Sequence, residues 1–289
     1  MGASRPGRAM KARGALRSMP WFAAGVLAVF VAVALVPSLF APLPPLETNF
    51  LARNLAPFSA KAGKLFVLGT DQLGRDILSR ILHGATIALY VSVIAVFVSG
   101  LIGTVAGLLA GYFGGWVDQI IMRLCDTWLA LPMVSFAIFI SAIREPSLLN
   151  IVIVLVLVFW TRYARVVRGE VLSLRERDFI KLALTAGASP GRILFVHLLP
   201  NVVNSVIVLA TLMIGNVILA EAVLSFLGLG VPAPHPAWGS MLSDGRNGLM
   251  AGRWWATVFP GLAIVLVVGS SNLLGDWLRR FLDPNRKGL

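Results

Sequence analysis

The chain has 289 residues, of which 57% are hydrophobic and only 13% are charged, and its formal net charge is +12. A soluble globular protein carries about 25% charged residues, so this composition excludes an ordinary soluble domain. The charges stand in short clusters between long apolar runs, which disfavours nucleic-acid binding because no basic face is formed. The single cysteine, Cys125, excludes an internal disulfide and is expected to be a thiol in the core.

Six apolar stretches are long enough, or nearly so, to cross a bilayer as helices, which takes about 20 residues. They are residues 21–41, 85–111, 120–143, 147–163, 202–227 and 254–277. The pattern predicts an all-α integral membrane protein with about six transmembrane helices. It also predicts a basic tail at 1–20, a transmembrane domain over 21–289, an outer loop at 42–84 and a basic inner loop at 164–201.

The start of the chain is open to two interpretations. Five basic residues precede the first apolar stretch, as in a secretory signal peptide; they are Arg5, Arg8, Lys11, Arg13 and Arg17. The stretch is longer than the apolar core of a usual signal peptide, and no clean A-x-A cleavage site follows it. We therefore expect an uncleaved first helix.

The distribution of lysine and arginine predicts the orientation. Six helices place both termini on one side, and that side carries 17 of the 25 basic residues, mostly in the tail, between residues 162 and 192, and after the last helix. The positive-inside rule then places both termini in the cytoplasm. Tryptophans near the ends of the spans, such as Trp21 and Trp254, suit the interfacial belt.

Motifs for catalysis are absent or out of context. The sequence contains no G-x-x-x-x-G-K-[ST] phosphate-binding loop, which excludes ATP binding by that route. Residues 187–191 match the G-x-S-x-G motif of hydrolases, but that motif needs a strand before it and a sheet to present the serine. The three histidines are scattered and show no metal-ligand spacing.

Two features of the spans each leave two interpretations open. Gly103, Gly107 and Gly111 recur at four-residue spacing, which lets another helix approach closely. Packing within the chain is favoured over contact with a partner subunit. Glu221 is the only acidic residue deep in the fifth stretch, where a carboxylate is costly. It either lines a translocation path or pairs with a polar neighbour near the outer end.

The inner loop contains the most informative segment, residues 178–201. Its pattern predicts a short helix, a turn broken by glycine at 187–191, a second helix and a stop at Pro200. A helical hairpin with an exposed apolar rim on the cytoplasmic face is typical of a docking surface. The alternative is a plain linker that lies on the membrane surface.

This segment resembles the coupling loop of ABC importer permeases, whose EAA motif reads Glu-Ala-Ala, three residues, Gly, and a later Leu-Pro. Ala183 matches the second alanine and Gly187 the glycine, while Lys181 and Leu182 replace the glutamate and the first alanine. The resemblance implies that the loop couples the chain to an ATPase. The coupling residues that it implies are Ala183, Gly187, Ala188, Ser189, Leu199 and Pro200.

Further motifs resemble the C-type permeases of the dipeptide, oligopeptide and nickel group. An outer-loop signature covers residues 68–76. Residues 221–230 resemble that group's ending of the fifth span, and motifs at 238–242, 254–261 and 272–284 follow in the same order. The outer-loop residues singled out by the resemblance are Gly69, Asp71, Gly74, Arg75 and Asp76.

The resemblance implies a multi-pass permease of the type I ABC importer fold in the bacterial inner membrane. Its expected partners are a B-type second permease, two ATPase subunits or domains, and an extracytoplasmic substrate-binding protein. The chain itself would carry no cofactor, and the ATPases would use ATP and magnesium. Di- or oligopeptides are the expected cargo, with nickel complexes, glutathione or another small solute as alternatives.

Two functions of other classes remain. A secondary transporter would normally show inverted repeats with interrupted helices and more charge within the membrane, and neither is clear in the sequence. An intramembrane enzyme would need paired catalytic residues inside the spans, where only Glu221 lies deep.

Overall fold

The computed structural model describes residues 19–61 and 63–282. The tail predicted at 1–20 lies almost entirely outside these residues. The helices are α2 (Trp21–Leu35), α3 (Pro37–Phe40), α4 (Ile77–Phe113), α5 (Gly115–Ala130), α6 (Met133–Ile143), α7 (Leu148–Arg175), α8 (Asp178–Thr185), α9 (Pro190–Arg192), the π-helical segment η2 (Ile193–Leu198), α10 (Leu199–Phe226), α11 (Trp238–Leu249) and α12 (Trp255–Leu282). The loop after α3 contains a single 3-10 turn, η1 (Phe50–Ala52), and the antiparallel strands β1 (Ser59–Lys61) and β2 (Lys64–Phe66).

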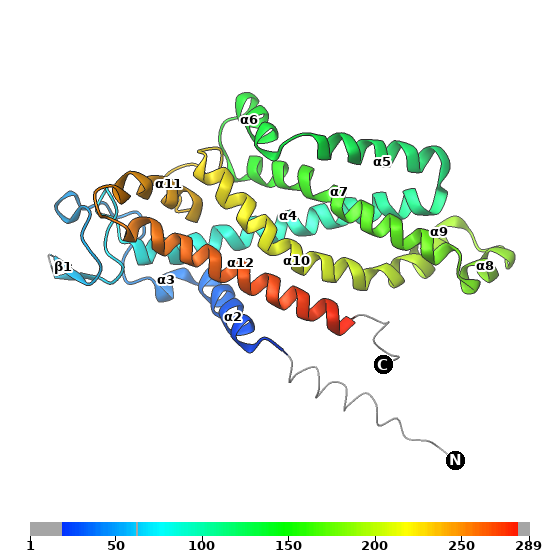
Figure 1. The fold of residues 1–289 in the computed structure, drawn as a ribbon, viewed down its shortest axis with the longest axis horizontal. Helices are drawn as coiled ribbons and strands as arrows, with labels where there is room; N and C mark the ends of the chain where they lie inside the picture. The colour runs from blue at the N-terminus through cyan, green and yellow to red at the C-terminus, as the bar shows by residue number, and fades with distance from the viewer. Residues whose placement is uncertain (1–18, 62, 283–289) are drawn as a thin grey trace, which may run out of the picture.

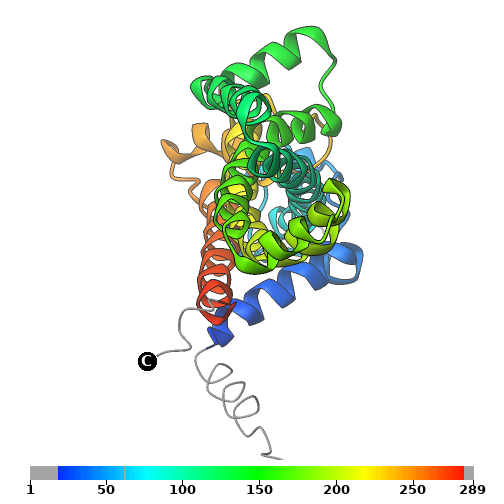
Figure 2. The same ribbon diagram turned by 90° about the vertical axis from the view of Figure 1, so that its right-hand side faces the viewer.

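Four long helices, α4, α7, α10 and α12, run along the molecule (Figure 1). The helix α11 and the β1–β2 hairpin lie at one end of this group, and α8 and α9 lie at the other (Figure 1). Seen from that second end, α2, α5 and α6 lie outside the central group (Figure 2). One buried cluster joins α4, α7 and α10, and another joins α2, α4, α10, α11 and α12.

The long helices have the length and composition of membrane spans. This holds for α4, for α7, for the continuous run from α9 to α10, and for α12. The pair α5 and α6 qualifies only as one broken span, bent by 87°, and α2 is apolar but has only 15 residues. Each of the six predicted stretches therefore contains helix, and four of them lie in full-length spans.

The stretch predicted as a span at 120–143 is not one straight helix. The helix α5 ends at Ala130 and α6 begins at Met133, with Leu131 and Pro132 in extended conformation between them. Proline has no N–H to donate and disfavours a helical conformation for the residue before it. The chain therefore bends at this point instead of continuing as a straight helix.

Two helices extend beyond the predicted spans. The helix α7 continues to Arg175, so residues 164–175 of the predicted inner loop extend the helix of the fourth span. On this extension, Arg165 and Arg168 form ion pairs with aspartates of α5. The helix α4 begins at Ile77, directly after its cap, and not at residue 85. Charged and capping residues set the ends of α4 and α7. The sequence prediction counted only apolar residues, so it placed these ends too early or too late.

The helices α4 and α7 pack closely because three glycines of α4 face α7. A Cβ atom on Gly103 would lie 2.5 Å from the Cβ of Tyr163, and one on Gly107 would lie 2.6 Å from the carbonyl oxygen of Ala164. Gly111 is in equally close contact with α7. Small residues permit such an approach between membrane helices. The expectation that these glycines serve packing within the chain is confirmed.

Candidate functional site

The small residues predicted for coupling lie in the last turns of α8 and in the turn that follows it, at the end of the bundle (Figure 1). Ala188 donates its backbone N–H to the carbonyl of Ala183, and Gly187 donates to Leu184, both at 3.0 Å. This pair of bonds is a Schellman helix ending. Gly187 has a φ of 76°, which glycine adopts without the steric cost of a side chain. The local sequence therefore ends α8 in a sharp turn.

A second helical segment starts directly after this turn. The hydroxyl of Ser189 accepts a hydrogen bond from the N–H of Arg192 at 3.4 Å, and Pro190 takes the first helical position, as is usual at helix starts. The segment continues through η2 into α10, whose first turn contains Leu199 and Pro200. The predicted stop at Pro200 is therefore wrong, since the wide π-helical turn before it accommodates a residue without an N–H.

Buried apolar side chains anchor this segment to the bundle. Ile180 of α8 and Ile193 and Leu198 of η2 have no exposed surface, and they pack against side chains of α4 and α7. A second set of apolar side chains on the same segment is 42–68% exposed, and we call it the apolar rim; it consists of Phe179, Leu182, Leu184, Phe195 and Val196. The segment thus buries some apolar side chains against the bundle and leaves others exposed.

The charge at Lys181, where the EAA motif has glutamate, does little to hold α8. Lys181 pairs with Glu176 at 3.2 Å, and the two side chains are 56% and 77% exposed. An exposed ion pair contributes about 0–1 kcal/mol. The buried Ile180 is therefore the main anchor of α8, and Lys181 remains accessible to a partner.

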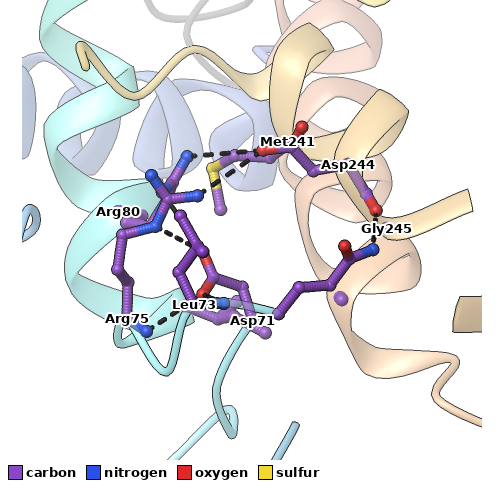
Figure 3. Close-up of a pocket in the computed structure, with 10 residues that line it drawn as sticks. Asp71, Leu73, Arg75, Arg80, Met241, Asp244 and Gly245 are labelled. Atoms are coloured by element: carbon purple, nitrogen blue, oxygen red, sulfur yellow. Dashed lines mark hydrogen bonds and ion pairs between the residues drawn. The ribbon is translucent and has the colours of Figure 1, made fainter. Parts of the chain in front are cut away.

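The outer-loop motif forms a charge network at the opposite end of the bundle (Figure 3). Asp71 is buried and accepts hydrogen bonds from the backbone N–H groups of Leu73 and Arg75, from Nε of Arg75 at 2.7 Å and from Nη1 of Arg80 at 3.2 Å. The two arginines also face Asp244 of α11, at 3.6 and 4.0 Å. This network ties the loop to the start of α4 and to α11.

The other residues of the motif shape the loop locally. Gly69 and Gly74 have φ angles of 80° and 74°, and a side chain at Gly74 would overlap the carbonyl of Asn49. The Oδ2 atom of Asp76 accepts hydrogen bonds from the N–H of Ser79 at 2.8 Å and from its hydroxyl at 2.6 Å, which caps α4. The five motif residues singled out in the sequence thus belong to one compact structure.

Long-range contacts fasten α11 over this network. Gln72 donates to the carbonyl of Asp244 at 2.5 Å, and Nε1 of Trp238 donates to the carbonyl of Ile81 at 2.9 Å. A cavity of about 190 Å³ lies between the loop and α11. Sequence reasoning missed Asp244, because 172 residues separate it from Gln72 and no motif includes it. Trp238, in contrast, stands in one of the resembling motifs.

Glu221 lies near the outer end of α10 and is only 2% exposed. The hydroxyl of Ser225 donates to its Oε1 atom at 2.6 Å, and the same hydroxyl oxygen accepts from the N–H of Val231 at 3.3 Å. Glu221 therefore helps to join the last turn of α10 to the segment that follows. This placement favours the interpretation as a structural pair over a role in the translocation path.

These arrangements suit mechanical coupling. Within residues 19–61 and 63–282, no group of three or more histidine, cysteine, aspartate or glutamate side chains is placed to hold a metal ion. The helices α8 and α9 lie at one end and α11 lies at the other, and α4, α7 and α10 run between them (Figure 1). Three long helices therefore connect the two ends of the bundle.

Comparison with known proteins agrees with this geometry. Residues 103–288 match the family model described as binding-protein-dependent transport system inner membrane component. The dipeptide transport system permease protein DppC of Alkalihalophilus pseudofirmus is 44% identical over 91% of this chain and 84% of its own length. The glutathione transport system permease protein GsiD of Pectobacterium atrosepticum is 46% identical over 76% of this chain and 73% of its own length. The di/tripeptide transport system permease protein DppC of Pseudomonas aeruginosa is 44% identical over 77% of this chain and 73% of its own length.

A solved structure shows the same fold. A chain of the MetNI methionine ABC transporter in an inward-facing conformation matches with a TM-score of 0.56 at 17% identity, over 71% of this chain and 96% of that chain. The architecture is thus that of a type I importer permease. Proteins of this family work with an ATPase and a substrate-binding protein. By family, coverage and fold, the chain is a member of the binding-protein-dependent transport system inner membrane components, the multi-pass permease subunits of bacterial ABC importers.

Proposed function

We propose that this chain is one of two permease subunits of a peptide importer, forms half of its translocation pathway, and receives ATP-driven movement through residues 178–201. Two of the relatives are named for dipeptides or di/tripeptides, and a third is named for glutathione, which is itself a tripeptide. These names support peptides as the cargo class. Glutathione, a nickel complex or another small solute is the alternative for the same architecture.

The observation that carries this proposal is the anchored hairpin with its apolar rim. A contiguous exposed apolar patch marks a site of interaction with a partner, and a helix laid into a groove is a common way to cover one. Ile180, Ile193 and Leu198 hold the hairpin in place, so a force on the rim would be passed on to the bundle. A plain linker would not need this buried anchor.

The proposed assembly adds a B-type second permease, two ATPase subunits or domains against residues 178–201, and a binding protein against the end that contains α11. The chain has no phosphate-binding loop, so the ATPases would bind ATP and magnesium, and this chain would neither hydrolyse ATP nor carry a cofactor. Closure of the ATPases would push α8 and η2. Because η2 continues into α10, the push would travel along that helix toward α11.

The orientation proposed from the basic residues places the turn after α8 in the cytoplasm and α11 outside. Met250, just after α11, is 98% exposed, Ser189 is exposed, and the native Cys125 is fully buried. In intact spheroplasts, a Met250→Cys variant is expected to react with a membrane-impermeant thiol reagent, whereas Ser189→Cys is expected to react only after permeabilisation. Labelling in the reverse pattern would contradict this orientation.

The proposed function is tested by reconstitution in proteoliposomes with the second permease, the ATPases and the binding protein. We expect uptake of radiolabelled dialanine that requires both ATP and the binding protein, and no ATP hydrolysis by this chain alone. Uptake driven by an ion gradient without ATP would indicate a secondary transporter. ATP-dependent uptake of nickel or of glutathione without uptake of dialanine would reject simple dipeptides as the cargo.

A further inference from the structure

Three arginines at three-residue intervals on α7 differ in what faces them. Arg165 donates to Asp126 at 2.5 Å, and Arg168 donates to both carboxylate oxygens of Asp118, at 2.9 and 2.5 Å. Both aspartates belong to α5. No carboxylate of the described part of the chain forms an ion pair with Arg162. Arg162 is therefore a cation without a counter-charge among the described residues.

The contacts that Arg162 does make are weak and apolar. Its guanidinium lies 5.3 Å from the centre of the Phe159 ring, and its Nη1 atom lies 3.9 Å from the Sδ atom of Met213. The side chain is otherwise exposed at the surface of this chain. Aromatic and sulfur contacts hold a guanidinium in position without neutralising its charge. The group is thus held in place and remains free to meet an anion.

Arg162 lies on a helix that has the length and composition of a membrane span. It stands near the middle of α7 (Leu148–Arg175), and its neighbour Met213 stands near the middle of α10 (Leu199–Phe226). Both helices have the length and composition of membrane spans. The span predicted from sequence at 147–163 put Arg162 at its inner edge, where it would reach the headgroups. Within a span an arginine is costly in lipid, and such residues face a protein interior or a watery cavity.

We propose that Arg162 lines the translocation pathway and binds the free carboxylate of the cargo. The inference rests on the proposed function. A guanidinium pairs with a carboxylate through two parallel charge-assisted hydrogen bonds, and dipeptides and glutathione, for which the relatives are named, share this group. Arg165 and Arg168 are already held by aspartates, so Arg162 is the one of these three arginines that is available. Phe159 and Met213 beside it lower the local polarity, which strengthens the attraction.

The test measures binding of dialanine and of dialanine amide, which lacks the carboxylate, to the assembled complex in nanodiscs without the binding protein. The wild-type complex is expected to bind dialanine about tenfold or more tightly than the amide, as for a hydrogen bond to a charged group. Arg162→Met is expected to abolish this preference, and Arg162→Lys is expected to retain part of it. Arg165→Met is the matched control on the same helix and should retain the preference.

Several outcomes would overturn the inference. A wild-type complex without the preference would contradict it, and so would an Arg162→Met complex that keeps the preference. A lower yield of the Arg162→Met complex, with the preference intact in what remains, would assign Arg162 to an ion pair with the second permease instead. ATP-dependent uptake of dialanine is measured in parallel. Uptake without a binding preference rejects this inference alone, whereas a lack of uptake rejects the proposed function.

Discussion

Substitution of Gly187 by glutamate is expected to abolish the stimulation of ATP hydrolysis by loaded binding protein while the spans remain inserted. Gly187 has a φ of 76°, where a residue with a side chain pays about 1–2 kcal/mol. No atom of the described residues lies within 4 Å of the position that a Cβ would take, so the new carboxylate would enter the space proposed for the ATPase. An unpaired carboxylate buried at a contact is costly, and we expect the stimulated rate to fall by about tenfold or more.

A Gly187→Asn variant separates backbone strain from obstruction. Asparagine adopts positive φ more readily than most residues and carries no charge, so it should retain most of the stimulation. The measurement is the ATPase rate of the reconstituted complex with and without loaded binding protein. If Gly187→Glu leaves both stimulation and transport unchanged, residues 178–201 are a plain linker. Equal losses in both variants would show that backbone conformation, and not the added charge, is critical.

Substitution of Gly103 by valine is expected to remove most of the folded permease from the membrane. Even the first added carbon would lie 2.5 Å from the Cβ of Tyr163 and would also collide with the backbone of Trp160. Backbone cannot move aside as a flexible side chain can, so α4 and α7 would have to separate. Overpacking of this kind costs about 3 kcal/mol or more, and at 1.4 kcal/mol for each factor of ten this is about a hundredfold in the ratio of folded to unfolded chain.

A Gly169→Val variant is the matched control, because it makes the same substitution in a helix of the same pair. Within the part of the chain that the structure describes, a Cβ at Gly169 would meet no atom within 4 Å, so only the change in helix propensity remains. The yield of monodisperse complex after extraction and size-exclusion chromatography measures the effect. If both variants give wild-type yields, α4 and α7 do not depend on the close approach at Gly103.

The sequence by itself determined the class of the protein and the turn at residues 187–191. A membrane span needs about 20 apolar residues, because polar groups are costly in hydrocarbon. Such a stretch is a property of the composition and can be recognised without knowledge of tertiary contacts. The turn at residues 187–191 could also be predicted from the sequence. Gly187 favours the end of one helix, and Ser189 with Pro190 favours the start of the next. Local chemistry of this kind is encoded within a few neighbouring residues.

Only the tertiary structure decided which side chains meet. It showed that Gly103 and Gly107 face α7, that Glu221 pairs with Ser225, and that Asp244 joins a network 172 residues away from Gln72. It also moved Arg162 from the edge of a short span to the middle of a long helix. The free energy of a buried polar or small residue depends on what lies opposite it in space, and that neighbour is set by helix packing rather than by position in the chain.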